Sequence, residues 1–269
     1  MSADWRVSAR MALCALLALY AQGAEPKSPR FSVEFTDPEV ASYASVIRAD
    51  CEEWYPKIAS LLFGALDRGD PAEVRLVFKE QPESGYATMN TKSRVWTMHL
   101  SSTEAKTPAA LDYRAVAIHE LTHVVQNHAP VPGSLVWLSE GIADYVTYTY
   151  FTKTNAPRLQ LDKQGFFTGY TETQPYLFGL QKKRVRPDGE YRPRRVRPGK
   201  GYRHGYTVAA AFLLWLETRK SKDIVQKLSV ALFERRFRME LFERHCGAKL
   251  DTLWREFLAE SAAGGRDRY

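Results

Sequence analysis

The sequence predicts one α+β domain, in which strands precede a mainly helical C-terminal part. Four short segments with alternating apolar residues lie before residue 101, which is typical of strands. A helix with a His-Glu-x-x-His motif follows them, and apolar helical patterns fill most of the chain after residue 205. No solenoid repeat or second core pattern is visible, so we expect a single domain over residues 24–269.

The first 23 residues differ in kind from the rest. Arg6 and Arg10 precede an apolar run at residues 11–20, and small residues follow it. This pattern is typical of a secretory signal peptide, and the run is short for a membrane span. We expect cleavage near Ala24 and a secreted protein, extracellular or periplasmic. An uncleaved anchor is the alternative.

The charge balance predicts a basic exported protein. The net charge is +7, and removing Asp4, Arg6 and Arg10 with the signal peptide leaves +6 (7 − 1 = 6). Such a protein adheres to polyanions, so an acidic polysaccharide or an anionic surface is an expected partner. We expect no specific nucleic acid partner, and a monomer.

Cysteine usage leaves one question open. Loss of Cys14 leaves Cys51 and Cys246, which in an exported protein either form a disulfide or stay separate buried thiols. Two cysteines are too few for a cysteine-based zinc site.

The elements are expected in the following order. Strands are predicted at residues 31–35, 73–78, 85–90 and 94–100, the last two forming a hairpin. Helices are predicted at residues 37–66 with an interruption at Pro56, and at 111–128, 135–148, 206–216, 223–233 and 251–258.

Residues 151–200 show no periodicity and are predicted to be a basic insertion rich in proline and glycine. Residues 182–203 hold ten Lys or Arg against Asp188 and Glu190. A loop this long is usually functional or disordered. It is either a solvated surface loop or an arm that binds polyanions, and both alternatives are open.

The motif in the helix at 111–128 carries the chemistry. His119 and His123 are four residues apart, so both imidazoles lie on one helical face, at the spacing that two ligands of one zinc ion need. Glu120 is about 100° further round the helix, where its carboxylate can take a proton from a metal-bound water. A core helix with two satisfied histidines is the alternative.

The next helix offers the remaining ligand. A catalytic zinc has three protein ligands and a water, and Glu140 is the best candidate for the third. Asp144 follows one turn later and can accept the outer N–H of a ligating imidazole, with His119 the expected partner. Apolar neighbours such as Trp137 and Ile142 favour a buried role for both carboxylates over an exposed helix face.

Three phrases carry a resemblance to a known family: residues 119–126 (HELTHVVQ), 140–145 (EGIADY) and 205–210 (GYTVAA). They resemble the basic secretory protein family, within the zincin metallopeptidases whose zinc has a glutamate ligand. The resemblance implies a zincin-like fold with a twisted mixed sheet packed on the metal-binding helix, Zn²⁺ as cofactor, and peptide or protein substrates. By this resemblance His119, His123 and Glu140 are ligands and Glu120 is the base. The long basic segment departs from the family pattern.

The implied reaction also needs a donor for the developing oxyanion. Tyr206 and His204 are the candidates, at the entry to the apolar helix. A packing tyrosine and a surface histidine are the alternatives.

Two functions from different classes compete. The first is a secreted zinc endopeptidase, and the second is a secreted basic protein that binds glycans or surfaces with little or no proteolysis. The presence of Glu120 favours the enzyme, because a pure binder has no use for a general base beside two ligand-spaced histidines. An aminopeptidase lacks support, because such enzymes bind the substrate's amino group through an acidic residue, and no Gly-Ala-Met-Glu-like motif precedes the helix.

Overall fold

The computed structural model describes most of the chain after residue 27. The described residues are 28–106, 110–127, 131–153, 158–163, 167–171, 194–195, 201–204 and 206–264. The expected signal peptide and most of the basic segment 182–203 lie outside them. Among the described helices, none combines the length and the apolar character that crossing a membrane requires.

Four strands form a mixed sheet in the spatial order β1-β2-β4-β3. They are β1 (Arg30–Phe35), β2 (Glu73–Lys79), β3 (Gly85–Asn90) and β4 (Val95–Ser101). β1 and β4 run parallel to β2, while β3 runs antiparallel to β4 at the edge of this sheet. Leu76 and Met98 are opposite each other and fully buried, because one face of the sheet packs against helices. The four predicted strands and the mixed sheet are confirmed.

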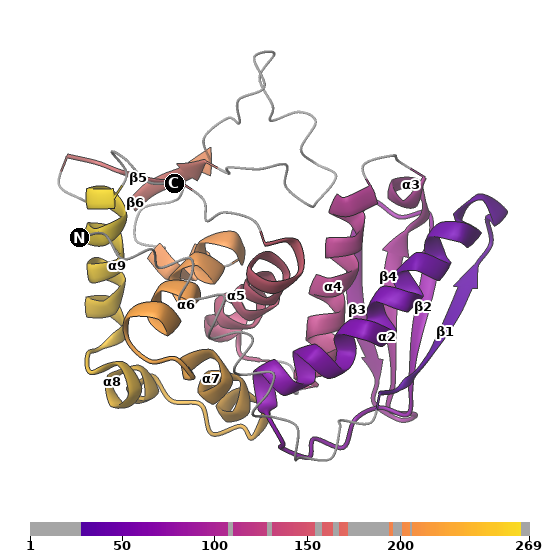
Figure 1. Cartoon of the computed structure of the whole chain (residues 1–269), viewed down its shortest axis with the longest axis horizontal. Helices are drawn as coiled ribbons and strands as arrows, with labels where there is room; N and C mark the ends of the chain where they lie inside the picture. The colour runs from indigo at the N-terminus through magenta and orange to yellow at the C-terminus, as the bar shows by residue number, and fades with distance from the viewer. Residues whose placement is uncertain are drawn as a thin grey trace, which may run out of the picture.

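Two long helices pack on this sheet, and Figure 1 shows them between the sheet and the rest of the molecule. They are α2 (Ala41–Phe63), preceded by η1 (Pro38–Val40), and α4 (Ala110–Gln126), preceded by the short α3 (Ser102–Ala105). α2 continues through Pro56, so the predicted interruption is wrong. An interior proline costs a helix about 3 kcal/mol. Full burial of Tyr55 and Leu62 on either side offsets that cost.

The remaining helices form the other side of the molecule (Figure 1). They are η2 (Gly133–Leu135), α5 (Val136–Tyr145), η3 (Val146–Thr152), η5 (Gly201–His204), α6 (Tyr206–Arg219), α7 (Ile224–Phe233), α8 (Glu240–Cys246) and α9 (Leu250–Gly264). The predicted helix at 135–148 stays α-helical only to Tyr145 and then widens into the π-helix η3. α8 was not predicted, because seven residues are too few to show a clear period.

α5 and α6 approach each other closely at a glycine. A Cβ on Gly141 would lie 2.6 Å from the Cβ of Ala209, a distance that real side chains do not adopt. Gly141 directly follows Glu140 on α5, and Ala209 lies in the first turn of α6. The absence of a side chain at position 141 therefore sets how near α6 comes to the carboxylates of α5.

A second, small sheet corrects the prediction of an irregular segment at 151–200. Its antiparallel strands are β5 (Arg158–Leu161), β6 (Phe167–Thr171) and β7 (Arg194–Arg195). The strands are short, and the register shifts at Gln160 and Leu161. Such irregularity removes the alternation by which strands are found in a sequence. Phe167 packs against Trp254 of α9, with ring centroids 5.7 Å apart.

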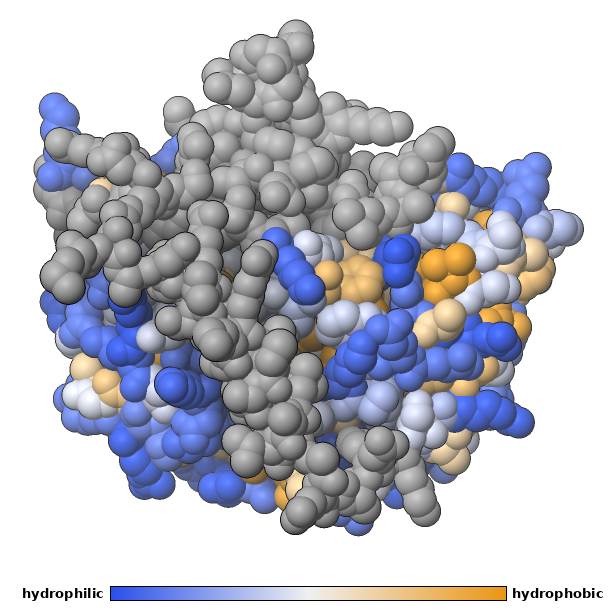
Figure 2. All heavy atoms as spheres, in the orientation of Figure 1, coloured by the Kyte–Doolittle hydropathy of each residue, from blue (hydrophilic) through white to orange (hydrophobic). Residues whose placement is uncertain are grey.

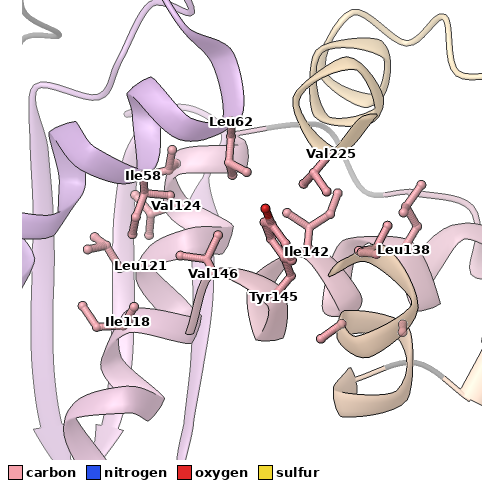
Figure 3. Close-up of a cluster of buried hydrophobic side chains, with 14 of the residues drawn as sticks. Ile58, Leu62, Ile118, Leu121, Val124, Leu138, Ile142, Tyr145, Val146 and Val225 are labelled. Atoms are coloured by element: carbon pink, nitrogen blue, oxygen red, sulfur yellow. The ribbon is translucent and has the colours of Figure 1, made fainter. Parts of the chain in front are cut away.

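Apolar side chains from both sides of the molecule pack together (Figure 3). Those drawn include Ile58 and Leu62 from α2, Ile118, Leu121 and Val124 from α4, Leu138, Ile142 and Tyr145 from α5, Val146 from η3 and Val225 from α7. On the face seen in Figure 2, the surface over α8 is predominantly hydrophilic, whereas apolar patches lie mainly on the side of the sheet. Cys51 and Cys246 are free thiols, so the disulfide alternative does not hold in this structure.

Candidate metal centre

α4 presents both histidines of the motif to one point. His119 is 3% exposed, and its Nε2 lies 3.2 Å from Nε2 of His123. The ring centroids are 4.9 Å apart, as expected for a pair one helical turn apart. Leu121 and Val124 anchor the opposite face of α4 in the core, with no exposed surface. The apolar face of α4 therefore determines where the imidazoles point.

α5 brings the predicted third ligand to the same point. Oε2 of Glu140 lies 3.3 Å from Nε2 of His119 and 3.5 Å from Nε2 of His123. The three possible ligand atoms lie within 4.8 Å of one another. Two imidazoles and one carboxylate form the donor set of many catalytic zinc sites, so these residues are compatible with a metal ion.

The hydrogen bonds around the histidines are consistent with a cation between these atoms. Nδ1 of His119 lies 2.8 Å from Oδ1 of Asp144, which as a carboxylate can only accept. A neutral His119 therefore carries its proton on Nδ1 and a lone pair on Nε2. That lone pair faces the carboxylate of Glu140 at 3.3 Å. Two electron-rich atoms at this distance repel each other unless a positive charge lies between them.

The pKa values point the same way. Burial lowers the pKa of His119, but the carboxylates of Asp144 and Glu140 raise it more, so it lies well above its usual value. Burial likewise lowers the pKa of His123, and Glu140 more than compensates. Burial raises the pKa of Glu140, but the two imidazoles bring it well below its usual range. The centre thus favours positive charge, which protons or a metal ion can supply.

Asp144 lies where the sequence reasoning placed it, beside His119. It is fully buried, and Oδ2 accepts a hydrogen bond of 3.3 Å from the hydroxyl of Thr207, at the start of α6. The same hydroxyl lies 3.5 Å from the hydroxyl of Tyr148 in the π-helix. Sequence reasoning missed both of these residues. Thr207 lies 63 positions after Asp144, so no spacing rule could connect them.

Gln126 was also missed, although its position gave a signal. It follows His123 by three residues, which puts the two side chains next to each other on one helical face. Oε1 of Gln126 lies 2.9 Å from Nδ1 of His123. Its Nε2 and Oε1 also contact Ser139 of α5.

Glu120 lies between the histidines and the edge strand. Its side chain is 5% exposed, and the backbone N–H of Ala87 in β3 hydrogen bonds to its carboxylate. Burial raises its pKa, while the neighbouring imidazoles oppose the rise. A Cβ on Gly85 would lie 3.2 Å from Cγ of Glu120 and 2.9 Å from Cγ1 of Val116. Gly85 therefore lets β3 lie close to this glutamate.

The two candidate oxyanion donors lie in different surroundings. The ring of Tyr206 is nearly parallel to that of His119, with centroids 6.3 Å apart and an angle of 17°. Tyr206 has a φ of 47°, a conformation that is strained for a non-glycine residue. His204 in η5 packs edge-on against Tyr170 of β6, with centroids 5.3 Å apart. The structure thus brings Tyr206 to the histidines, while the ring of His204 packs on the small sheet.

Comparisons with known proteins bear on a different part of the chain. A family model, BSP, described as a peptidase of plants and bacteria, matches residues 182–257. The chain is similar to this peptidase family. The match covers 76 residues (257 − 181 = 76) of 269, and includes Tyr206 and Thr207 but not the motif in α4. It supports a relationship to the basic secretory proteins and is consistent with a peptidase. A search of curated proteins and a search of solved structures found no match.

Proposed function

We propose that the protein is an exported zinc peptidase with a zincin-like fold and Glu120 as its general base. The convergence of His119, His123 and Glu140 beside the buried Glu120 supports this most strongly. The peptidase family match supports the same class of reaction from another part of the chain. Export rests on the signal-like pattern of residues 1–23.

His119, His123 and Glu140 would hold the zinc, and Asp144 would fix the ring of His119. Zinc bound at such a site lowers the pKa of a water molecule and polarises a carbonyl group. The remaining chemistry falls to side chains of the protein.

Glu120 would receive the proton of the attacking water and deliver it to the leaving amine. Its buried position raises its pKa above the usual value of a glutamate, which suits a group that must both accept and release a proton. The hydrogen bond to the backbone of Ala87 holds the carboxylate in place between these two steps.

Tyr206 would donate a hydrogen bond to the developing oxyanion. Burial raises the pKa of its hydroxyl to about 12, so at neutral pH the hydroxyl keeps the proton that it must donate. The contact of its ring with His119 places it at the edge of the centre.

The edge strand supports a peptide as the substrate. In the described sheet, β3 pairs only with β4, so its other edge is open. β3 also carries Ala87, whose backbone N–H is hydrogen bonded to Glu120. An extended peptide can add to such an edge through its main chain, beside the general base.

A combined metal and activity measurement tests the proposal. We expect the purified mature protein to contain one zinc ion per chain and to cleave casein. A chelator should abolish cleavage, and added zinc should restore it. The control is the same protein treated with chelator already saturated with zinc.

The competing function gives a different result. A glycan- or surface-binding protein with little proteolytic activity would bind an acidic polysaccharide column but leave casein intact, with or without zinc. Zinc-containing protein that cleaves neither casein nor short peptides would rule out the peptidase.

A further inference from the structure

The outer nitrogen of His123 has an unusual partner, a neutral amide. The side chain of Gln126 is 1% exposed, and its Oε1 lies 2.9 Å from Nδ1 of His123. The other end of the same amide reaches α5, where Nε2 donates a hydrogen bond of 3.2 Å to the main-chain carbonyl of Ser139. The hydroxyl of Ser139 donates a further hydrogen bond of 3.1 Å to Oε1.

Ser139 determines which way the amide points. A main-chain carbonyl can only accept, so the atom that faces it must be the amide nitrogen of Gln126. The reverse orientation would place two acceptors opposite each other in a site that is buried from water, which is unfavourable. The oxygen of Gln126 must therefore face His123.

The orientation of the amide in turn determines the state of the imidazole. Opposite an acceptor, Nδ1 of His123 must carry a hydrogen, which leaves the lone pair of a neutral ring on Nε2. Nε2 is the atom that lies 3.2 Å from His119 and 3.5 Å from the carboxylate of Glu140. The hydrogen bond that Nδ1 of His123 donates to Oε1 of Gln126 thus gives His123 the tautomer that a metal ligand needs.

We propose that Gln126, held by Ser139, is a positioning residue that fixes the tautomer and the ring orientation of His123. The role rests on the proposed zinc site. Ser139 directly precedes Glu140, so the same hydrogen bonds also tie α4 to the residue before the third ligand. Gln126 therefore aligns ligands that come from two different helices.

A neutral amide suits this position for an electrostatic reason. Glu120, Glu140 and Asp144 already place three carboxyl groups around two histidines. A fourth carboxylate at position 126 would add repulsion between like charges. The amide orients His123 through its oxygen without that repulsion.

Zinc affinity measures the expected effect. In full-length mature protein, competition with a chromophoric chelator should show about 10- to 100-fold weaker zinc binding for Gln126→Leu, as for other lost partners of ligating histidines. Gln126→Glu keeps an acceptor opposite Nδ1 but loses the donor to the carbonyl of Ser139 and adds a fourth carboxylate, so its affinity should lie between those of the wild type and Gln126→Leu. The control is Thr122→Val, which removes a buried hydrogen bond to Ile118 in the same helix without touching His123.

Nitrogen-15 NMR of the zinc-loaded protein separates a positioning role from a merely structural one. In the wild type, the ring of His123 should show a slowly exchanging proton on Nδ1 and coordination through Nε2. That proton should exchange rapidly in Gln126→Leu and stay protected in Thr122→Val.

Several outcomes would overturn the proposal. One is coordination of wild-type His123 through Nδ1, which needs no variant and so holds even if Gln126→Leu fails to fold. Another is unchanged zinc affinity in a folded Gln126→Leu, which would leave the zinc site standing without this role. Absence of zinc binding by the wild type would instead refute the proposed function itself, and the role with it.

Discussion

The two sides of the molecule reach the candidate metal centre by different means. The sheet side supplies His119, Glu120 and His123 from consecutive turns of one helix, so their relation is local. The helical side supplies Glu140 from α5, and its supporting contact joins Asp144 to a threonine 63 residues later. Half of the centre therefore follows from the geometry of one helix, while the other half depends on how α5 packs against α4 and α6.

The two sides also bury their charges differently. On the sheet side, Asp50 forms a two-pronged ion pair with Arg114, with both contacts at 2.6 Å. On the helical side, Glu217 of α6 is hydrogen bonded to the hydroxyl of Tyr145, which contacts Tyr150 at 2.9 Å. Burial raises the pKa of Glu217 to about 7, and the bond to Tyr145 only partly opposes the rise.

The largest expected effect concerns the sheet side. His119→Ala or His123→Ala should abolish tight zinc binding, because a single imidazole and Glu140 are too few ligands. Metal analysis after gel filtration checks this. Normal zinc content in either folded variant would show that the histidines of α4 are not the ligands.

Glu120→Gln separates catalysis from metal binding on the same helix. The amide keeps the shape of the side chain but cannot take a proton from water. Zinc content should therefore stay normal while peptide cleavage falls by a factor of roughly 100 or more. Steady-state rates at equal zinc loading measure the effect, and a wild-type rate would exclude Glu120 as the base.

Two substitutions in α5 test the contribution of the helical side. Glu140→Ala should weaken zinc binding strongly, because a ligand is lost. Asp144→Asn should weaken it less, about 10- to 100-fold, because only the partner of His119 changes. Chelator competition ranks the two variants, and the reverse order would contradict the assigned roles.

The smallest expected effect is on stability and arises at Glu217. Its folded-state pKa of about 7 lies above the ordinary value of 4.5, so the folded state binds more protons between these pH values. Stability from this group is therefore greatest at low pH and falls as the pH rises through about 7.

Glu217→Gln removes this dependence, because the amide stays neutral. We expect the variant to be more stable than the wild type by roughly 1–3 kcal/mol at pH 8 and about equal at pH 4.5. Urea unfolding at the two pH values measures the difference. The matched variant Asp50→Asn should instead lose stability at pH 8, because it breaks the ion pair with Arg114. An equal gain at both pH values would show that Glu217 is not buried as a neutral acid.

Much of the fold could be predicted from local pattern. Alternation marked the four strands of the large sheet, and helical periodicity marked α2, α4, α6, α7 and α9. The π-helix after Tyr145, the short α8 and the small sheet escaped notice. They are too short or too irregular for a period to accumulate, and Pro56 shows that packing can override a local signal.

For the site, residue spacing in the sequence was enough to predict which side chains lie together on one helix. The four-residue spacing of His119 and His123, and of Glu140 and Asp144, predicted which side chains share a face, because helical geometry is the same in every protein. Contacts between side chains of different helices could not be predicted in this way and depend on how the helices pack. Two contacts depend on the distance between packed helices. They are the hydrogen bond from Thr207 to Asp144 and the hydrogen bond by which Ser139 orients Gln126. That distance is set by the volumes of the side chains at the contact, as where Gly141, without a Cβ, allows the close approach of Ala209. Residues that pack in this way can lie far apart in the sequence, so no periodic pattern reveals the contact.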